Sequence, residues 1–306
     1  MLELLGKTNI DFIGKRRYAF LFSGVMSLLG LVTVIQIGRG QANTGIDFAG
    51  GTAVQMQFEQ PVHLDEARAL LQREGFPDAE LQQFTDGNKL LVRVKKQTTI
   101  QERTADRLVA VFRQGLSSNP FVVDSSTEIG PTVGAKLQRD AVKAIIIAMI
   151  GIIVYIALRF EFRFGVAAAV ATLHDVLAVL GVMWLLDKEI NLLIVTALLT
   201  LAGYSLTDTV VVFDRIRENL RTRRRDPLAQ VINQGINQVL SRTIVVSLTV
   251  FLVLLALFFF GGEVIHDFAL ALLLGVVIGT YSSIFVASPL LLLWPGAQGK
   301  LLKRTA

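Results

Sequence analysis

Six long apolar runs, each bounded by polar or charged residues, dominate the sequence. An α-helix needs about 20 predominantly apolar residues to cross the hydrocarbon core of a bilayer. The pattern therefore predicts a polytopic α-helical membrane protein with six transmembrane helices. The runs lie near residues 18–38, 141–158, 165–186, 190–213, 243–260 and 268–294.

The first apolar run follows basic residues that include Lys15, Arg16 and Arg17, as the apolar region of a signal peptide would. It is longer than such a region, and it ends at Gly38-Arg39-Gly40 without the small-residue pattern of a cleavage site. We therefore expect residues 1–38 to form an N-terminal segment and a retained first transmembrane helix.

Residues 39–139 contain no long apolar run. Val54, Met56 and Phe58 instead occupy every second position, which is typical of a strand with one buried face. The order β-α-β-β-α-β predicts one ferredoxin-like α+β domain, inserted between spans 1 and 2. Similar patterns predict strands at 52–59, 79–84, 89–95 and 121–129 and helices at 63–75 and 99–116.

Basic residues cluster in the loops 159–164 and 214–242 and in the tail 295–306, whereas the turns on the opposite side hold only Lys188. Loops rich in lysine and arginine stay on the cytoplasmic side. We therefore expect both termini to be cytoplasmic and residues 39–139 to lie outside. Residues 140–294 then hold helices 2–6 together with the cytoplasmic loop 214–242.

The loop 214–242 has its own helical pattern. Asp226 and Pro227 predict a helix start, with Asp226 as the cap and Pro227 at the first position. Val231 and Ile236 fall near one face, and Asn233 lies opposite. We expect an amphipathic helix at the cytoplasmic membrane interface or against a partner subunit.

The composition narrows the function classes. Of 306 residues, 52% are hydrophobic and 18% are charged, with a formal net charge of +5. Because the basic residues lie in short loops, they indicate membrane topology and not nucleic-acid binding. The chain has no cysteine, which excludes disulfides and thiol chemistry, and no clustered metal ligands are visible. Gly50-Gly51-Thr52 lacks the phosphate-loop signature, so we expect no ATP hydrolysis, no enzyme activity and no cofactor.

Asp208 lies inside the fourth apolar run, roughly 9 Å from its charged end. An ionisable residue within a span is costly and by default functional. Arg242 opens the next span at a similar depth, and we expect it to be the partner. A buried carboxylate that lies far from any guanidinium favours its protonated form, whereas one beside a guanidinium favours its ionised form. The pair therefore predicts a proton switch. The alternative is that Asp208 reaches the interface and serves only packing or topology.

Further polar residues lie inside the spans. Thr200, Tyr204 and Asp208 are spaced by four, which places Tyr204 on the same stripe as the proposed switch. His174 and Asp175 lie near the middle of the third span, where Asp175 is a candidate proton relay. Two alternatives stay open: His174 and Asp175 satisfy each other, and the stripe makes only interhelical hydrogen bonds.

Glycine-rich stretches flank the inserted domain on both sides. Glycine permits positive φ and close backbone approach, and proline stiffens a link, so we predict hinges that pass membrane motion to the domain. Ordinary turns are the alternative. The residues concerned are Gly45, Asp47, Gly50 and Gly51 before the domain, and Gly130, Pro131 and Gly134 after it.

Eight short motifs in order resemble those of the SecF family of the bacterial protein translocase, and the resemblance covers nearly the whole chain. Residue 207 departs from the family pattern, because Thr207 stands where asparagine is expected. The motifs are Gly45–Gly51, Ile129–Gly134, Leu158–Arg163, His174–Val176, Gly203–Asp208, Asp214–Asn219, Ser241–Thr243 and Gly279–Ile284.

The resemblance implies an export subunit of the bacterial inner membrane that is related to the RND superfamily of proton-driven exporters. Its implied partners are SecD, the SecYEG channel and the unfolded secretory polypeptide, with YajC as a further accessory. It also implies that proton flow drives the outer domain at late stages of preprotein translocation, and that Asp208 and Arg242 are proton-pathway residues.

Two other functions are compatible with the residues. One is a scaffold that only stabilises the channel and SecD, and the other is an RND-type small-molecule exporter. Sodium also remains open as the coupling ion, because a carboxylate with hydroxyl neighbours can bind either ion.

Overall fold

The structure is a computed structural model that describes residues 6, 8–84, 88–95, 103–223 and 225–293. The chain divides into two compact units. The helical unit comprises the described residues up to 43, 144–188 and from 193 onward, and the α+β unit comprises residues 44–143 and 189–192. The predicted tail 295–306 and the first residues of the predicted helix at 99–116 lie outside the described residues.

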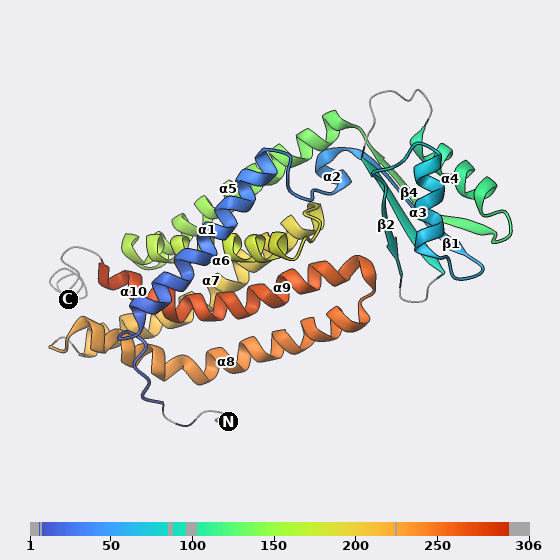
Figure 1. Ribbon diagram of the computed structural model, residues 1–306. Helices are drawn as coiled ribbons and strands as arrows, with labels where there is room; N and C mark the ends of the chain where they lie inside the picture. The colour runs from blue at the N-terminus through green and yellow to red at the C-terminus, as the bar shows by residue number, and fades with distance from the viewer. Residues whose placement is uncertain (1–5, 7, 85–87, 96–102, 224, 294–306) are drawn as a thin grey trace. The chain divides into compact units, whose positions relative to one another are not determined.

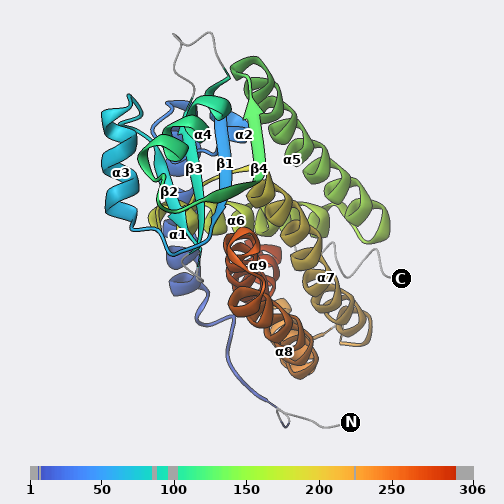
Figure 2. The ribbon, with the colours of Figure 1, turned by 90° about the vertical axis from the view of Figure 1, so that its right-hand side faces the viewer.

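The described residues contain six helices long and apolar enough to cross a membrane, which confirms the predicted polytopic fold. Helices α8 and α9 lie side by side in both views (Figure 1 and Figure 2). The last span continues beyond α9 as a π-helix, Ser283–Ala287, and then as α10, Ser288–Leu290, and a 3-10 turn, Leu291–Leu293. The spanning helices are α1 (Arg16–Gly38), α5 (Pro131–Arg159), α6 (Phe162–Leu185), α7 (Leu192–Thr222), α8 (Leu228–Phe260) and α9 (Glu263–Ser282).

The α+β unit has the predicted β-α-β-β-α-β order. Its described strands form an antiparallel sheet in the order β2-β3-β1-β4, and α3 and α4 cover one face of that sheet (Figure 1). Alternate residues of β1 and β3 point into this core, where Phe58 packs edge-on against Phe112 of α4. The elements are α2 (Ile46–Ala49), β1 (Gly51–Phe58), α3 (Leu64–Arg73), β2 (Glu80–Gln83), β3 (Lys89–Lys95), α4 (Thr104–Gly115) and β4 (Phe121–Ile129).

Gly51, the first residue of β1, has a φ of +154°, and a Cβ there would lie 2.4 Å from the carbonyl oxygen of Val94. Gly51→Ala is expected to destabilise the α+β unit by about 1–3 kcal/mol, because it adds both backbone strain and a clash. Hydrogen exchange of the β1 amides in the full chain measures this effect. The matched control is Gly130→Ala, because Gly130 has open space around its Cα and no positive φ. Equal exchange in the two variants would contradict the expectation.

The helix predicted to begin after Asp226-Pro227 is present, but it is not separate from the next apolar run. Helix α8 runs from Leu228 to Phe260 without a break, so this segment continues directly into the fifth predicted span. Pro227 is the residue before the helix, and the carboxylate of Asp226 pairs with Arg223 at 3.6 Å and does not cap the helix. The apolar face is buried in the helical core, where Val231 and Ile236 join Ile216 of α7.

The polar face of the same helix binds the N-terminal segment of the chain. The Asn233 Oδ1 accepts a hydrogen bond from the amide of Phe12 at 2.9 Å, and the Asn237 Oδ1 accepts one from Ile10 at 2.9 Å. Both asparagine Nδ2 groups donate to the carbonyl oxygen of Ile10. Phe12 is buried and packs edge-on against Phe285. The amphipathic pattern therefore reflects two protein contacts and not a membrane surface.

Candidate functional site

Asp208 lies on α7 with a side chain only 4% exposed. Its Oδ2 accepts a hydrogen bond from the hydroxyl of Ser247 on α8 at 3.2 Å. The hydroxyl of Thr280 on α9 lies 2.7 Å from the same Ser247 oxygen. The buried carboxylate on α7 is thus contacted by a short chain of two hydroxyl groups, one from α8 and one from α9.

Arg242 is exposed on α8, and the described residues offer it no ion pair. The expected Asp208–Arg242 pair is therefore absent from this structure. Five residues along a helix amount to a net rotation of about 140°. Since Ser247 faces Asp208, Arg242 points to a different side of the helix.

Arg242 instead lines a groove of about 590 Å³ between α7 and α8. Val211, one turn after Asp208, lines the same groove. The other charged groups there have partners: Arg215 pairs with Glu218 at 2.7 Å, and Asp214 lies 3.7 Å from Arg159, which is outside the groove. Arg242 is therefore the unpaired charge of this groove among the described residues.

Two buried hydroxyl groups lie near this arrangement without a hydrogen-bond partner among the described residues. They are the Oη of Tyr204, one turn before Asp208, and the Oγ1 of Thr243, which follows Arg242. Thr200, by contrast, donates to the carbonyl oxygen of Thr196 in its own helix. The predicted polar stripe is thus divided, since Thr200 is satisfied locally and Tyr204 is not.

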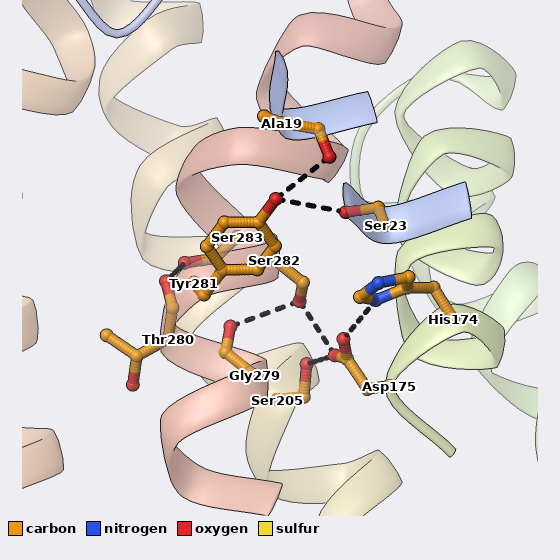
Figure 3. Close-up of polar contacts among 10 residues, drawn as sticks. All are labelled: Ala19, Ser23, His174, Asp175, Ser205, Gly279, Thr280, Tyr281, Ser282 and Ser283. Atoms are coloured by element: carbon orange, nitrogen blue, oxygen red, sulfur yellow. Dashed lines mark hydrogen bonds and ion pairs between the residues drawn. The ribbon is translucent and has the colours of Figure 1, made fainter. Parts of the chain in front are cut away.

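Asp175 lies on α6, is fully buried and accepts hydrogen bonds from three side chains (Figure 3). The hydroxyls of Ser205 on α7 and of Ser282 on α9 both donate to its Oδ2, the latter at 2.7 Å. Its Oδ1 lies 2.9 Å from the His174 Nδ1. The Nε2 of His174 is buried and has no partner among the described residues. Asp175 therefore joins three helices through hydrogen bonds.

Small residues bring these helices close enough for the contacts to form. The spacing Gly275-x-x-x-Gly279 predicts close helix contact, and the structure confirms it. A Cβ at Gly279 would lie 3.1 Å from the Cβ of Ser205, and one at Gly275 would overlap Leu201. Tyr281 connects α9 to α1, because its hydroxyl donates to the carbonyl oxygen of Ala19 at 3.0 Å (Figure 3).

In the α+β unit, the first glycine motif forms the short helix α2 and the turn into β1. Gly50 and Gly51 have positive φ, whereas Gly45 has a φ of −63°. Gly45 is required for another reason, since a Cβ there would lie 2.3 Å from the Oε1 of Glu189. Asp47 accepts a hydrogen bond from the amide of Leu192 at 3.0 Å.

The second glycine motif begins α5. Pro131 is the first residue of that helix, where its missing amide hydrogen costs nothing. Gly134 lies one turn later against the carbonyl of Phe48. Gly130 precedes the helix in open space and without positive φ. The two motifs therefore lie side by side within the α+β unit.

The arrangement around Asp208 consists of one buried carboxylate and two hydroxyl groups. The described residues contain no group of three or more His, Asp or Glu side chains placed to hold a metal. A lone buried carboxylate beside hydroxyl groups can bind and release a proton. The sequence places Ser247 and Ser282 within predicted spans but does not predict which carboxylate each one contacts. The reason is that the rotation of each helix about its axis is set by packing.

Models of known families match two parts of this chain. The model for the C-terminal part of the protein export membrane proteins SecD/SecF matches residues 113–297, and the SecD/SecF GG motif matches residues 43–62. The protein translocase subunit SecF of Thermodesulfovibrio yellowstonii is 52% identical over 306 residues, which cover 99% of this chain and all of that one. The SecF of Vibrio alginolyticus is 39% identical over 95% of this chain and 92% of its own.

Solved structures of larger proteins match as well. The crystal structure of SecDF from Thermus thermophilus covers 96% of this chain with a TM-score of 0.82 and 38% identity. A SecDF structure in a super-membrane-facing form covers 95% with a TM-score of 0.69 at the same identity. This chain spans about 39% of each of those chains.

Proposed function

The chain belongs to the SecD/SecF family of protein-export membrane proteins, and from this premise we propose that it uses the proton motive force to promote late stages of preprotein translocation. It is a multi-pass membrane protein that functions in protein export. In the proposal it lies in the bacterial inner membrane with both termini cytoplasmic and the α+β unit outside. It hydrolyses no ATP and needs no cofactor.

The proposed obligate partner is SecD. A protein named SecDF in Thermus thermophilus aligns with 94% of this chain over only 38% of its own length, so a segment like this chain occurs there within a longer polypeptide. Separate chains that correspond to parts of one fused protein commonly form a complex. We further propose that the complex acts on unfolded secretory polypeptides at the SecYEG channel, with YajC as an accessory.

The observation that carries the proposal is the buried carboxylate of Asp208, held by Ser247 and separated from the exposed Arg242. In this separated arrangement the proton is the available counter-charge for Asp208. Movement of α7 against α8 that brought Arg242 to Asp208 would release that proton. One charge moved through the membrane field is worth about 2.3 kcal/mol per 100 mV, enough to bias a conformational change of a few kcal/mol.

Asp175 and Tyr204 are proposed as secondary members of the proton pathway, and the two glycine motifs as the hinges.

Arg242→Gln tests the proposal. It removes the positive charge that would displace the proton from Asp208. The stimulation of export by a proton gradient is therefore expected to be lost, while the complex with SecD still assembles. Export into membrane vesicles, measured beside quantitative pull-down of the complex, checks both parts. The matched control is Arg221→Gln, because Arg221 is also an exposed arginine, on α7.

The result separates the proposal from its rivals. Loss of export in proportion to lost complex would instead identify a scaffold. Stimulation of the parental complex by a sodium gradient in place of a proton gradient would identify sodium as the coupling ion. Normal stimulation in Arg242→Gln vesicles would remove Arg242 from the pathway.

A further inference from the structure

The turn between α6 and α7, residues 186–191, makes contacts of two kinds. The Nζ of Lys188 lies 2.8 Å from the Oδ1 of Asp267 on α9, within the helical unit. The next four residues, 189–192, group with the α+β unit, and the helical unit resumes only at residue 193. Since α7 begins at Leu192, its first residue belongs to the α+β unit.

Residues 189–192 are held by an ion pair and by the backbone. The Oε2 of Glu189 lies 2.9 Å from the Nη1 of Arg93 on β3. The amide of Gly45 donates to the carbonyl oxygen of Ile190 at 3.0 Å, next to a parallel bridge between Thr44 and Ile190. The carboxylate of Asp47 accepts a hydrogen bond from the amide of Leu192, the first residue of α7. Three of these four residues, Glu189, Ile190 and Leu192, are thus attached to the glycine motif and the sheet.

Burial distinguishes this ion pair from another on the same sheet. The side chains of Arg93 and Glu189 are 25% and 13% exposed. Those of Lys95 and Glu80, 3.3 Å apart, are 51% and 42% exposed. An exposed pair contributes little, whereas removing one partner of a buried pair leaves an uncompensated charge. Arg93 and Glu189 therefore hold the turn in a way that Lys95 and Glu80 cannot.

We propose that residues 189–192 are a coupling element that keeps the first turn of α7 attached to the α+β unit, so that displacement of α7 moves that unit. This inference rests on the proposed function, in which Asp208 on α7 responds to protonation. Asp208 lies sixteen residues beyond Leu192 on an uninterrupted helix, a length of about 24 Å. Glu189 and Arg93 are positioning residues in this coupling, and neither touches the proton.

Hydrogen exchange tests the attachment without any transport. In the complete complex, Arg93→Glu is expected to speed exchange of the Gly45 and Leu192 amides by about tenfold or more, because two carboxylates then share a partly buried site. Adding Glu189→Arg to that variant restores slow exchange by reversing the pair. Lys89→Glu, which also places two like charges together on this sheet but beside Asp124 at the other end of β3, leaves both amides as in the parent. Parental exchange in Arg93→Glu would overturn the attachment.

Export measures the coupling itself. In vesicles with the whole complex, Arg93→Glu is expected to lose gradient-stimulated export while gradient-driven proton uptake and the amount of complex stay parental, and the charge-reversed pair restores export. Fast exchange with parental export in Arg93→Glu would overturn the coupling and leave the proposed function intact. Parental stimulation in Asp208→Asn would instead refute the proposed function, and the exchange measurement would still decide the attachment.

Discussion

Asp208→Asn is expected to abolish the stimulation of export by a proton gradient and to leave the amount of assembled complex unchanged. The substitution keeps the size of the side chain and an oxygen that can accept the hydrogen bond from Ser247. It removes the only function that the proposal requires, which is binding and releasing a proton. Export into vesicles with and without an imposed gradient measures the loss.

The control for this variant lies on the same helix. Asp214 is 46% exposed and is 3.7 Å from Arg159, also largely exposed, so its contribution is small. Asp214→Asn should therefore retain parental stimulation. Parental stimulation in Asp208→Asn as well would leave the chain as a support protein. A loss in both variants would point to general sensitivity of this region.

The membrane fold is predictable from the sequence because the bilayer imposes a length. Each span must bury its backbone polar groups within about 20 apolar residues, and no knowledge of packing is needed to find such runs. The α+β unit is predictable for a related reason. Its strands have one buried face, so Val54, Met56 and Phe58 alternate with polar residues, and its helices follow the period of 3.6.

The first part of α8 shows where the pattern is insufficient. Amphipathicity indicates that two faces of a helix meet different surroundings, but it does not identify them. The apolar face meets α7, and the polar face meets the backbone of residues 10–13. That second contact joins Asn233 to a segment more than two hundred positions away, a pairing that no local pattern encodes. No proline occurs between Pro227 and Phe260, and this was the available signal for one continuous helix.

The hydrogen-bond partners of the two buried carboxylates could not be predicted from the sequence either. Depth in the membrane follows from position along the chain, and this reasoning placed Asp208 and Arg242 near each other. The side of the helix on which a side chain lies depends on how the helices pack. That packing makes Ser247 the hydrogen-bond partner of Asp208. Likewise, Lys188 and Glu189 are adjacent charges in one short turn, yet they bind groups in different parts of the chain. Only the sequence position of the turn, and not its attachment, was predictable.

Asp175→Ala is expected to lower the stability of the helical unit by about 3 kcal/mol or more. Asp175 is fully buried, and its removal leaves the hydroxyl of Ser205 and the His174 ring without their acceptor, whereas Ser282 keeps the carbonyl oxygen of Gly279. Each buried donor without a partner costs about 1–3 kcal/mol. The midpoint of thermal unfolding in detergent measures the loss, and Ser282→Ala, which removes one donor and keeps the carboxylate, should lose much less.

Asp175→Asn separates the two roles that the sequence left open for this residue. The amide keeps an acceptor oxygen for the serines, so most of the stability is expected to remain, but it carries no titratable proton. Parental stimulation of export in this variant would make Asp175 a structural link between α6, α7 and α9. Lost stimulation at retained stability would make it a proton relay, because the hydrogen bonds that join those helices would still be in place. An Asp175→Ala protein as stable as the parent would contradict the structural role, since two unpaired donors cannot be buried without cost.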